Sequence, residues 1–199
     1  MSNHDDLTLD NSLANDTLAP VYVGFLPRFG AAALDFIINL PLIAVVTYVM
    51  VYNPNLYLYL GIMLLAALYK PGFEAWLGAT PGKLILKQRV VNAAGERIGF
   101  GKALVRALPW LIGSAVSVYV TSFAFDYLAG ADYDGFMEYG LVMQEYAEES
   151  DLGILGTLNQ WLWLLPLVSA FGIFFSARKQ AAHDVLAETF VVSTKDVFH

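Results

Sequence analysis

The chain contains no cysteine and only three histidines, His4, His183 and His199, which lie far apart in the sequence. Without thiols it can form neither disulfides nor thiolate metal sites, and three scattered histidines offer no zinc cluster. We therefore expect no metal, no cofactor and no redox chemistry. We expect neither an enzyme nor a nucleic-acid-binding protein.

Charged residues are also scarce. They make up 15% of the 199 residues, whereas 57% are hydrophobic, and the mean hydropathy is +0.55. A soluble domain usually carries about 25% charged residues, so this composition indicates one membrane domain.

The first 27 residues lack lysine and arginine but contain Asp5, Asp6, Asp10 and Asp16. A signal peptide needs a basic start followed by an apolar core, so no signal peptide is indicated. We interpret residues 1–27 as a polar acidic tail that ends in a turn at 24–27.

Four apolar stretches are long enough to cross the bilayer as helices, since about 20 helical residues span its ~30 Å hydrocarbon core. The predicted spans are residues 30–52, 56–77, 103–127 and 159–177.

Two of these spans are irregular in sequence. Pro71 and Gly72 predict a kink or break near the end of the second span. Asn159 interrupts the start of the fourth span, where Trp161 and Trp163 are typical of the aromatic belt at a membrane interface.

Loop charges predict the orientation. The connecting segment 78–102 is strongly basic, whereas residues 128–158 contain no Lys or Arg and many acidic residues. By the positive-inside rule, loop 78–102 and both termini face the cytoplasm, as expected for a bacterial inner-membrane protein. The outer acidic loop 128–158 is interpreted as a solvated surface, part of which is helical and follows the outer interface.

The basic loop contains β-rich sequence. Residues 86–91 and 97–100 read as two strands joined by a turn at 92–95, where Gly95 can adopt positive φ. The run 189–192 is also β-rich and is expected to pair with the edge of this hairpin, leaving 193–199 as a tail. The predicted fold is therefore an all-α polytopic membrane protein with four transmembrane helices, cytoplasmic termini and a small cytoplasmic β-hairpin.

The first span contains one charge, Asp35. A carboxylate in hydrocarbon costs roughly 3 kcal/mol on insertion scales, which makes it a candidate functional group. Arg28 lies seven residues earlier on the same helix face, about 10 Å away along the axis, so the two side chains are not expected to touch. Asn39 continues the polar stripe. Asp184 lies at the same depth as Arg28, which predicts an Arg28–Asp184 pair and leaves Asp35 to another donor or to protonation.

Other polar groups have simpler interpretations. Lys70 and Glu74 are expected to extend to the inner interface near Pro71, although Glu74 is also a candidate ion ligand. The sequence Gly78-x-x-x-Gly82-Lys83 is similar to a phosphate loop, but its glycine spacing is one residue short and a leucine follows the lysine, so we expect a tight turn.

The chain contains, in this order, Arg28-Phe29-Gly30-Ala31-Ala32-Ala33-Leu34-Asp35, Gly78-Ala79-Thr80-Pro81-Gly82-Lys83 leading into Arg89-Val90-Val91, Arg106, and His183-Asp184-x-Leu186-Ala187-x-Thr189. Taken together, these four motifs resemble the RDD family of small membrane proteins over residues 28–192. The family is named for one arginine and two aspartates, and the resemblance implies that these are Arg28, Asp35 and Asp184. The resemblance also implies transport of unidentified ligands, with cation/proton exchange proposed for some members. The tail is less basic than in many members, because Val185, Glu188 and Phe190 stand where Arg, Gly and Arg are common. The remaining motif residues are Gly78, Thr80, Gly82, Lys83, Arg106 and His183.

Two functions of different class remain open. In one, the protein exchanges monovalent cations for protons at Asp35 with Asn39, Asp184 and Glu74, and it forms a homo-oligomer because four helices scarcely enclose a path. In the other, the charges hold the helices together, and the cytoplasmic hairpin and C-terminal segment recruit a partner to a non-transporting scaffold or assembly factor. A crevice that reaches Asp35 favours the first.

Overall fold

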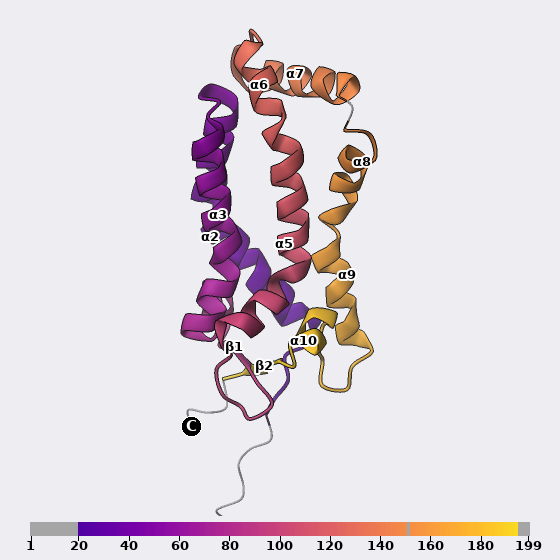
Figure 1. Cartoon of the computed structure of the whole chain (residues 1–199). Coiled ribbons are helices and arrows are strands. Elements are labelled where there is room, and N and C mark those ends of the chain that lie inside the picture. The colour runs from indigo at the N-terminus through magenta and orange to yellow at the C-terminus, as the bar shows by residue number, and fades with distance from the viewer. Residues whose placement is uncertain (1–19, 151, 195–199) are drawn as a thin grey trace, which may run out of the picture.

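The computed structural model describes residues 20–150 and 152–194. Long helices form an upright bundle, with a small sheet at one end, the sheet end, and a helix lying across the other, the α7 end (Figure 1). The long helices are α2 (Phe25–Tyr52), α3 (Leu56–Leu77), α5 (Phe100–Ser122) and α7 (Gly135–Glu149). The shorter elements are α4 (Pro81–Ile85), β1 (Gln88–Val91), α6 (Ala124–Gly130), α8 (Gly153–Leu162), α9 (Leu165–Phe171), η1 (Gly172–Phe174), α10 (Ala182–Leu186) and β2 (Phe190–Ser193).

Three helical stretches within the described residues are long and apolar enough to cross a membrane. They are Phe25–Tyr52, Leu56–Leu77 and Phe100–Gly130, the last combining α5 and α6. The pair Ile154–Leu162 and Leu165–Phe174 qualifies as a fourth span if it is counted as one bent helix. The structure therefore confirms a mainly helical protein with three to four candidate spans.

The first span begins earlier than predicted, whereas the predicted bounds of the second span, residues 56–77, are confirmed. The predicted turn at 24–27 is wrong, because α2 already begins at Phe25 and places Arg28 in its first turn. Pro27 is tolerated there, since the first amides of a helix have no intrahelical acceptor. Of the kink or break predicted at Pro71, a break is excluded, because α3 runs from Leu56 to Leu77 without interruption. Neighbouring helices make proline tolerable within a membrane helix.

The fourth candidate span is bent by 45° between α8 and α9. Trp163 lies at this bend and contacts Trp110 of α5 edge-on, with ring centroids 5.2 Å apart. Trp161 and Trp163 therefore lie near the middle of the bent pair and not at its end, contrary to the expected interfacial belt. Packing between helices places Trp163 here.

The sheet joins distant parts of the chain. β1 pairs antiparallel with β2, with Val90 opposite Val191. The predicted pairing of the C-terminal run is confirmed, but the predicted return strand at 97–100 is wrong: Arg97 makes only an isolated bridge to Val91. β2 brings Val191 into a buried cluster with Val23, Val90, Ile98 and Ala103, and this burial favours the long-range partner over the local hairpin.

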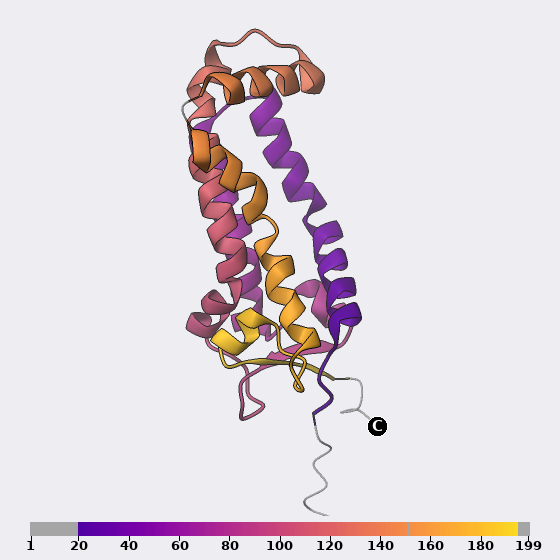
Figure 2. The ribbon, with the colours of Figure 1, turned by 90° about the vertical axis from the view of Figure 1, so that its right-hand side faces the viewer.

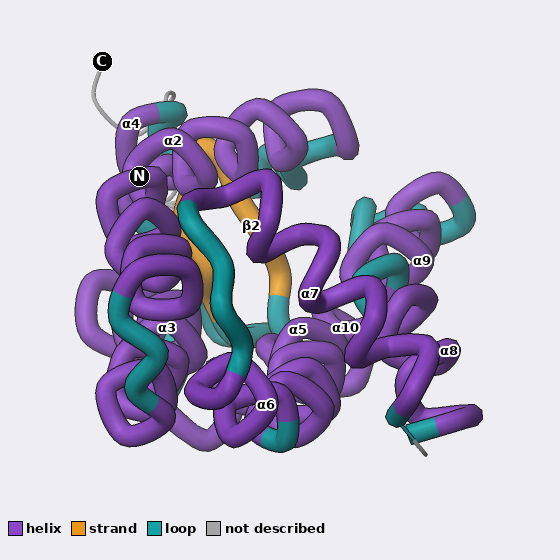
Figure 3. Tube along the Cα trace, turned by 90° about the horizontal axis from the view of Figure 1, so that it is seen from above, coloured by secondary structure: helices purple, strands orange, loops and turns teal. Residues whose placement is uncertain are grey.

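At the opposite end, α7 crosses the bundle, as Figures 1 and 3 show. The predicted helical segment in loop 128–158 is therefore present. Tyr146 of α7 contacts Tyr127 of α6, with ring centroids 5.3 Å apart. Figure 2 shows α2 on one side of the bundle and the α8–α9 pair on another. α2 packs on α3 and α4, whereas α5 packs on α3, α8, α9 and α10.

Candidate functional site

A buried ionic network lies at the sheet end of the bundle, with Arg106 of α5 at its centre. The Arg106 side chain is 1% exposed. Its Nε donates to Glu74 Oε2 at 2.8 Å, and its Nη1 donates to Asp184 Oδ1 and to Thr189 Oγ1, each at 2.5 Å. Arg106 thus ties α3 to α10 and to the segment that precedes β2.

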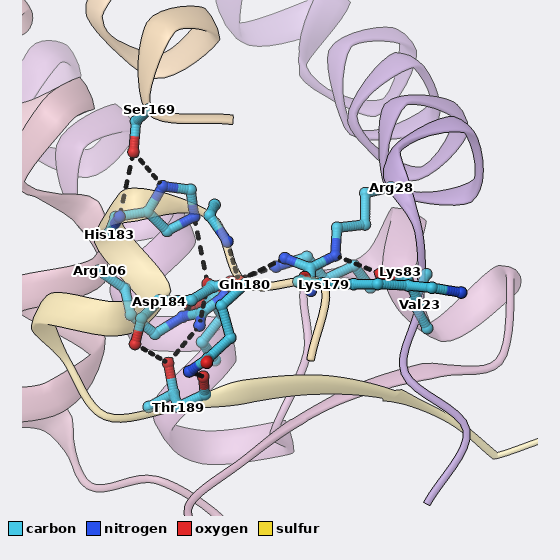
Figure 4. Close-up of polar contacts among 12 residues, drawn as sticks. Val23, Arg28, Lys83, Arg106, Ser169, Lys179, Gln180, His183, Asp184 and Thr189 are labelled. Atoms are coloured by element: carbon cyan, nitrogen blue, oxygen red, sulfur yellow. Dashed lines mark hydrogen bonds and ion pairs between the residues drawn. The ribbon is translucent and has the colours of Figure 1, made fainter. Parts of the chain in front are cut away.

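Two further cations complete this network (Figure 4). Arg28 pairs with Asp184 Oδ2, as the sequence predicts, and also donates to the carbonyls of Val23 and Lys179. Lys83 pairs with Glu74 Oε1. Glu74 is fully buried and does not extend to an interface as expected, because Lys83 and Arg106 supply the compensating charge that a buried carboxylate requires.

Local structure positions Asp184. It is the third residue of α10, and its Oδ2 accepts the backbone N–H of Ala181 at 3.1 Å. Carboxylates are favoured at this position because the first amides of a helix lack intrahelical acceptors. Burial works to raise the pKa of Asp184, but Arg106 and Arg28 outweigh it and hold the pKa well below its usual range.

His183 lies beside this network, and its imidazole is uncharged. Its Nδ1 is 2.7 Å from Ser169 Oγ, and its Nε2 is 3.3 Å from Asp184 Oδ1. Burial, reinforced by nearby cations such as Lys70, lowers the pKa of His183 to about 3. The imidazole is therefore neutral at physiological pH and acts as a hydrogen-bonding bridge between α9 and α10.

Asp35 has a different environment. Its Oδ1 accepts hydrogen bonds from Tyr69 Oη at 3.0 Å and from the Gly82 amide at 2.7 Å, and its Oδ2 accepts one from Thr80 Oγ1 at 2.6 Å. Among the described residues Asp35 has no ion-pair partner within 4 Å. Asn39 follows one turn later, and its Nδ2 donates to the Asp35 carbonyl at 2.7 Å. The donors that hold this carboxylate are all uncharged.

Asp35 also lines a cavity of about 570 Å³ between α2, α3, α5 and α9. Within the described part of the chain, it is the one carboxylate in the lining. The walls are largely apolar and include Phe36, Trp110 and Leu167. Lys70 lines the cavity too, and within residues 20–150 and 152–194 its ammonium makes neither a hydrogen bond nor an ion pair.

The structure brings most of the predicted residues together. Arg28, Asn39, Thr80, Lys83, Arg106 and His183 join Asp35 around the cavity, while Glu74 and Asp184 lie behind them in the ionic network. Gly78 has φ +77° and ends α3, and Gly82 lies in α4, so the phosphate-loop-like sequence is a turn followed by a short helix.

Sequence reasoning missed Tyr69 and Ser169 as members of the site, and it gave Thr189, which belongs to the motif that begins at His183, no role in the site. Tyr69 and Ser169 are ordinary residues in their segments, and no spacing or charge marks them. Tyr69 precedes Lys70 in an apolar run, and only the packing of α3 beside α2 reveals that its hydroxyl reaches Asp35.

These apolar helices and the buried ionic network at one end of the bundle define a polytopic membrane protein. A family model described as the RDD family matches residues 22–188, and the chain belongs to that family. Neither the curated proteins nor the solved structures contain a match to it.

Proposed function

We propose that this protein exchanges a monovalent cation for a proton across the membrane, with Asp35 as the exchanging carboxylate. One observation carries the proposal: Asp35 lines the cavity and is held by uncharged donors, whereas Glu74 and Asp184 are already neutralised by arginine and lysine. A carboxylate that is not paired with a cationic side chain can bind a mobile cation instead.

The groups around Asp35 fit a cation of this kind. The Thr80 and Tyr69 hydroxyls that donate to Asp35 each keep an oxygen lone pair, and the Asn39 amide oxygen lies one helical turn away. Hard cations bind oxygen ligands, and a proton competes for the same carboxylate. Binding of either species at Asp35 therefore excludes the other.

The ionic network has a supporting role in this proposal. Because each of its carboxylates already contacts two cationic side chains, Glu74 and Asp184 position the sheet end of the bundle and do not bind the transported ion. This departs from the sequence-based hypothesis, which included both as ion ligands.

Orientation and assembly belong to the same proposal. The excess of Lys and Arg in residues 78–102 supports a cytoplasmic sheet end and cytoplasmic termini in a bacterial inner membrane. We further propose that two or more copies associate, since three or four helices scarcely enclose a path. Single cysteines at Ala93 and Gly135 should be labelled from opposite sides of the membrane, and labelling of both from one side would refute this topology.

Transport is tested with purified full-length protein in liposomes that contain a pH-sensitive dye. Addition of Na⁺ or K⁺ outside should release protons from the lumen of liposomes that contain protein and not from empty ones. If correctly folded and inserted protein gives no cation-dependent proton movement, the exchange proposal fails and the scaffold alternative is favoured.

A further inference from the structure

A second cavity lies at the sheet end, away from Asp35, and it is bordered by basic residues. Its volume is about 540 Å³, and its lining includes Lys87 and Arg89 from the β1 region and Arg178 from the segment before α10. Among the described lining residues there is no carboxylate. We refer to this cavity as the basic groove.

The three basic side chains of the groove are available to a ligand. Lys87, Arg89 and Arg178 are exposed, and within the described residues none of them makes an ion pair or a side-chain hydrogen bond. Arg178 lies over the Phe190 ring, 5.6 Å from its centroid, and this contact leaves its guanidinium donors free. Three uncompensated positive charges in one concave surface favour an anion.

The position of the groove relative to the bilayer indicates which kind of anion binds there. α4, whose Leu84 lines the groove, also exposes Ile85 at 61%, and the segment before Arg178 exposes Phe175 at 90%. In a chain with membrane-spanning helices, such side chains fit contact with lipid. The basic residues follow them directly in the sequence, two residues after Ile85 and three after Phe175. This order places the groove at the level of the lipid headgroups.

We propose that the basic groove binds the headgroup of an anionic phospholipid, with Lys87, Arg89 and Arg178 on the phosphate. The apolar parts of Leu84, Tyr22 and Phe190 in the lining favour an amphipathic ligand over a free phosphate ion. This site is independent of the exchange proposed at Asp35, because the two cavities share none of their lining residues.

The test is native mass spectrometry of full-length protein in neutral detergent, titrated with phosphatidylglycerol or phosphatidylcholine. Wild type should bind phosphatidylglycerol at least tenfold more tightly than phosphatidylcholine. Each basic residue near an anionic headgroup increases the affinity by a factor of roughly five. The triple variant Lys87→Gln, Arg89→Gln, Arg178→Gln should lose this preference. The charge-preserving triple variant Lys87→Arg, Arg89→Lys, Arg178→Lys should keep it.

Two controls separate the groove from general positive charge and from free phosphate. The triple variant Arg97→Gln, Lys102→Gln, Lys179→Gln removes the same charge from basic residues outside the groove lining and should retain the preference. Glycerol phosphate at equal concentration should not displace the lipid. Equal binding of both lipids, equal loss in the control variant, or displacement by glycerol phosphate would each overturn the assignment.

Discussion

The backbone amide of Gly82 donates a hydrogen bond to Asp35 Oδ1 at 2.7 Å, which joins α4 to the middle of α2. This approach requires glycine. A Cβ at position 82 would overlap the Ala31 carbonyl and lie 2.9 Å from the Asp35 carboxyl carbon. Because Gly82 has no side chain, its amide can approach and hold the Asp35 carboxylate, which lies 47 positions earlier in the chain.

Gly82→Ala should destabilise the protein by about 1–3 kcal/mol, the usual cost of overpacking, because backbone must move to admit the methyl group. Gly61→Ala is the matched control, since a Cβ there would meet nothing within 4 Å outside its own stretch of helix and alanine favours the helix. Thermal unfolding in detergent measures both. If Gly82→Ala is as stable as Gly61→Ala, the described packing of α4 on α2 is incorrect.

The Arg28–Asp184 pair should show strong coupling in a double-mutant cycle. Asp184→Asn leaves Arg28 without its carboxylate and Arg106 with Glu74 alone, and it should cost about 3–5 kcal/mol. Combined with Arg28→Gln, the loss should be smaller than the sum by about 1–3 kcal/mol. The exposed pair Lys102–Glu188 is the control and should couple by less than about 1 kcal/mol. Additivity at Arg28 and Asp184 would contradict the contact.

Stability should fall as the pH is lowered from 7 to 5. The folded-state pKa of His183 is lowered to about 3, so protonation favours the unfolded chain, and stability is lost as the pH drops below the ordinary value near 6.5. The expected loss at pH 5 is about 2 kcal/mol. Asp184, whose pKa is also lowered, adds to the loss only below about pH 4.

The variant His183→Gln separates these contributions. Its unfolding free energy should change less between pH 7 and pH 5 than that of wild type, whatever its absolute stability. The same slope in both proteins would show that His183 is not the responsible group.

Lys70→Gln distinguishes a cation site from an anion site. The Lys70 ammonium lines the same cavity as Asp35 and repels a bound cation. Its removal should lower the cation concentration for half-maximal proton movement by a factor of about 2 to 10. Lys70→Arg keeps the charge and should behave as wild type. A higher half-maximal concentration in Lys70→Gln would indicate that the cavity binds an anion.

Hydropathy alone predicted the helical membrane fold, because the thickness of the bilayer sets the length of any span. The Arg28–Asp184 contact was also predictable, since both charges lie at one depth and each needs compensation. The pairing of the C-terminal β-rich run was predicted as well, but the absence of the return strand at 97–100 was not. A local hairpin through Gly95 has a low closure cost, and the sequence does not reveal that Arg97 makes only an isolated bridge to Val91.

The hydrogen-bond donors that surround Asp35 could not be predicted from the sequence. Tyr69, Thr80 and Gly82 come from three separate elements, and their convergence depends on α4 folding back against α2. No period or spacing in the sequence encodes that approach.

The most direct test of the central claim is cation-dependent proton movement by Asp35→Asn in liposomes. Asparagine keeps an acceptor for the Gly82 amide and the Tyr69 hydroxyl, so the variant should fold and insert, yet it cannot carry the charge. Asp126→Asn, at an exposed carboxylate of α6, is the matched control and should transport as wild type does. The account predicts that folded Asp35→Asn protein gives only the background of empty liposomes. Unchanged proton movement by folded Asp35→Asn protein would contradict it.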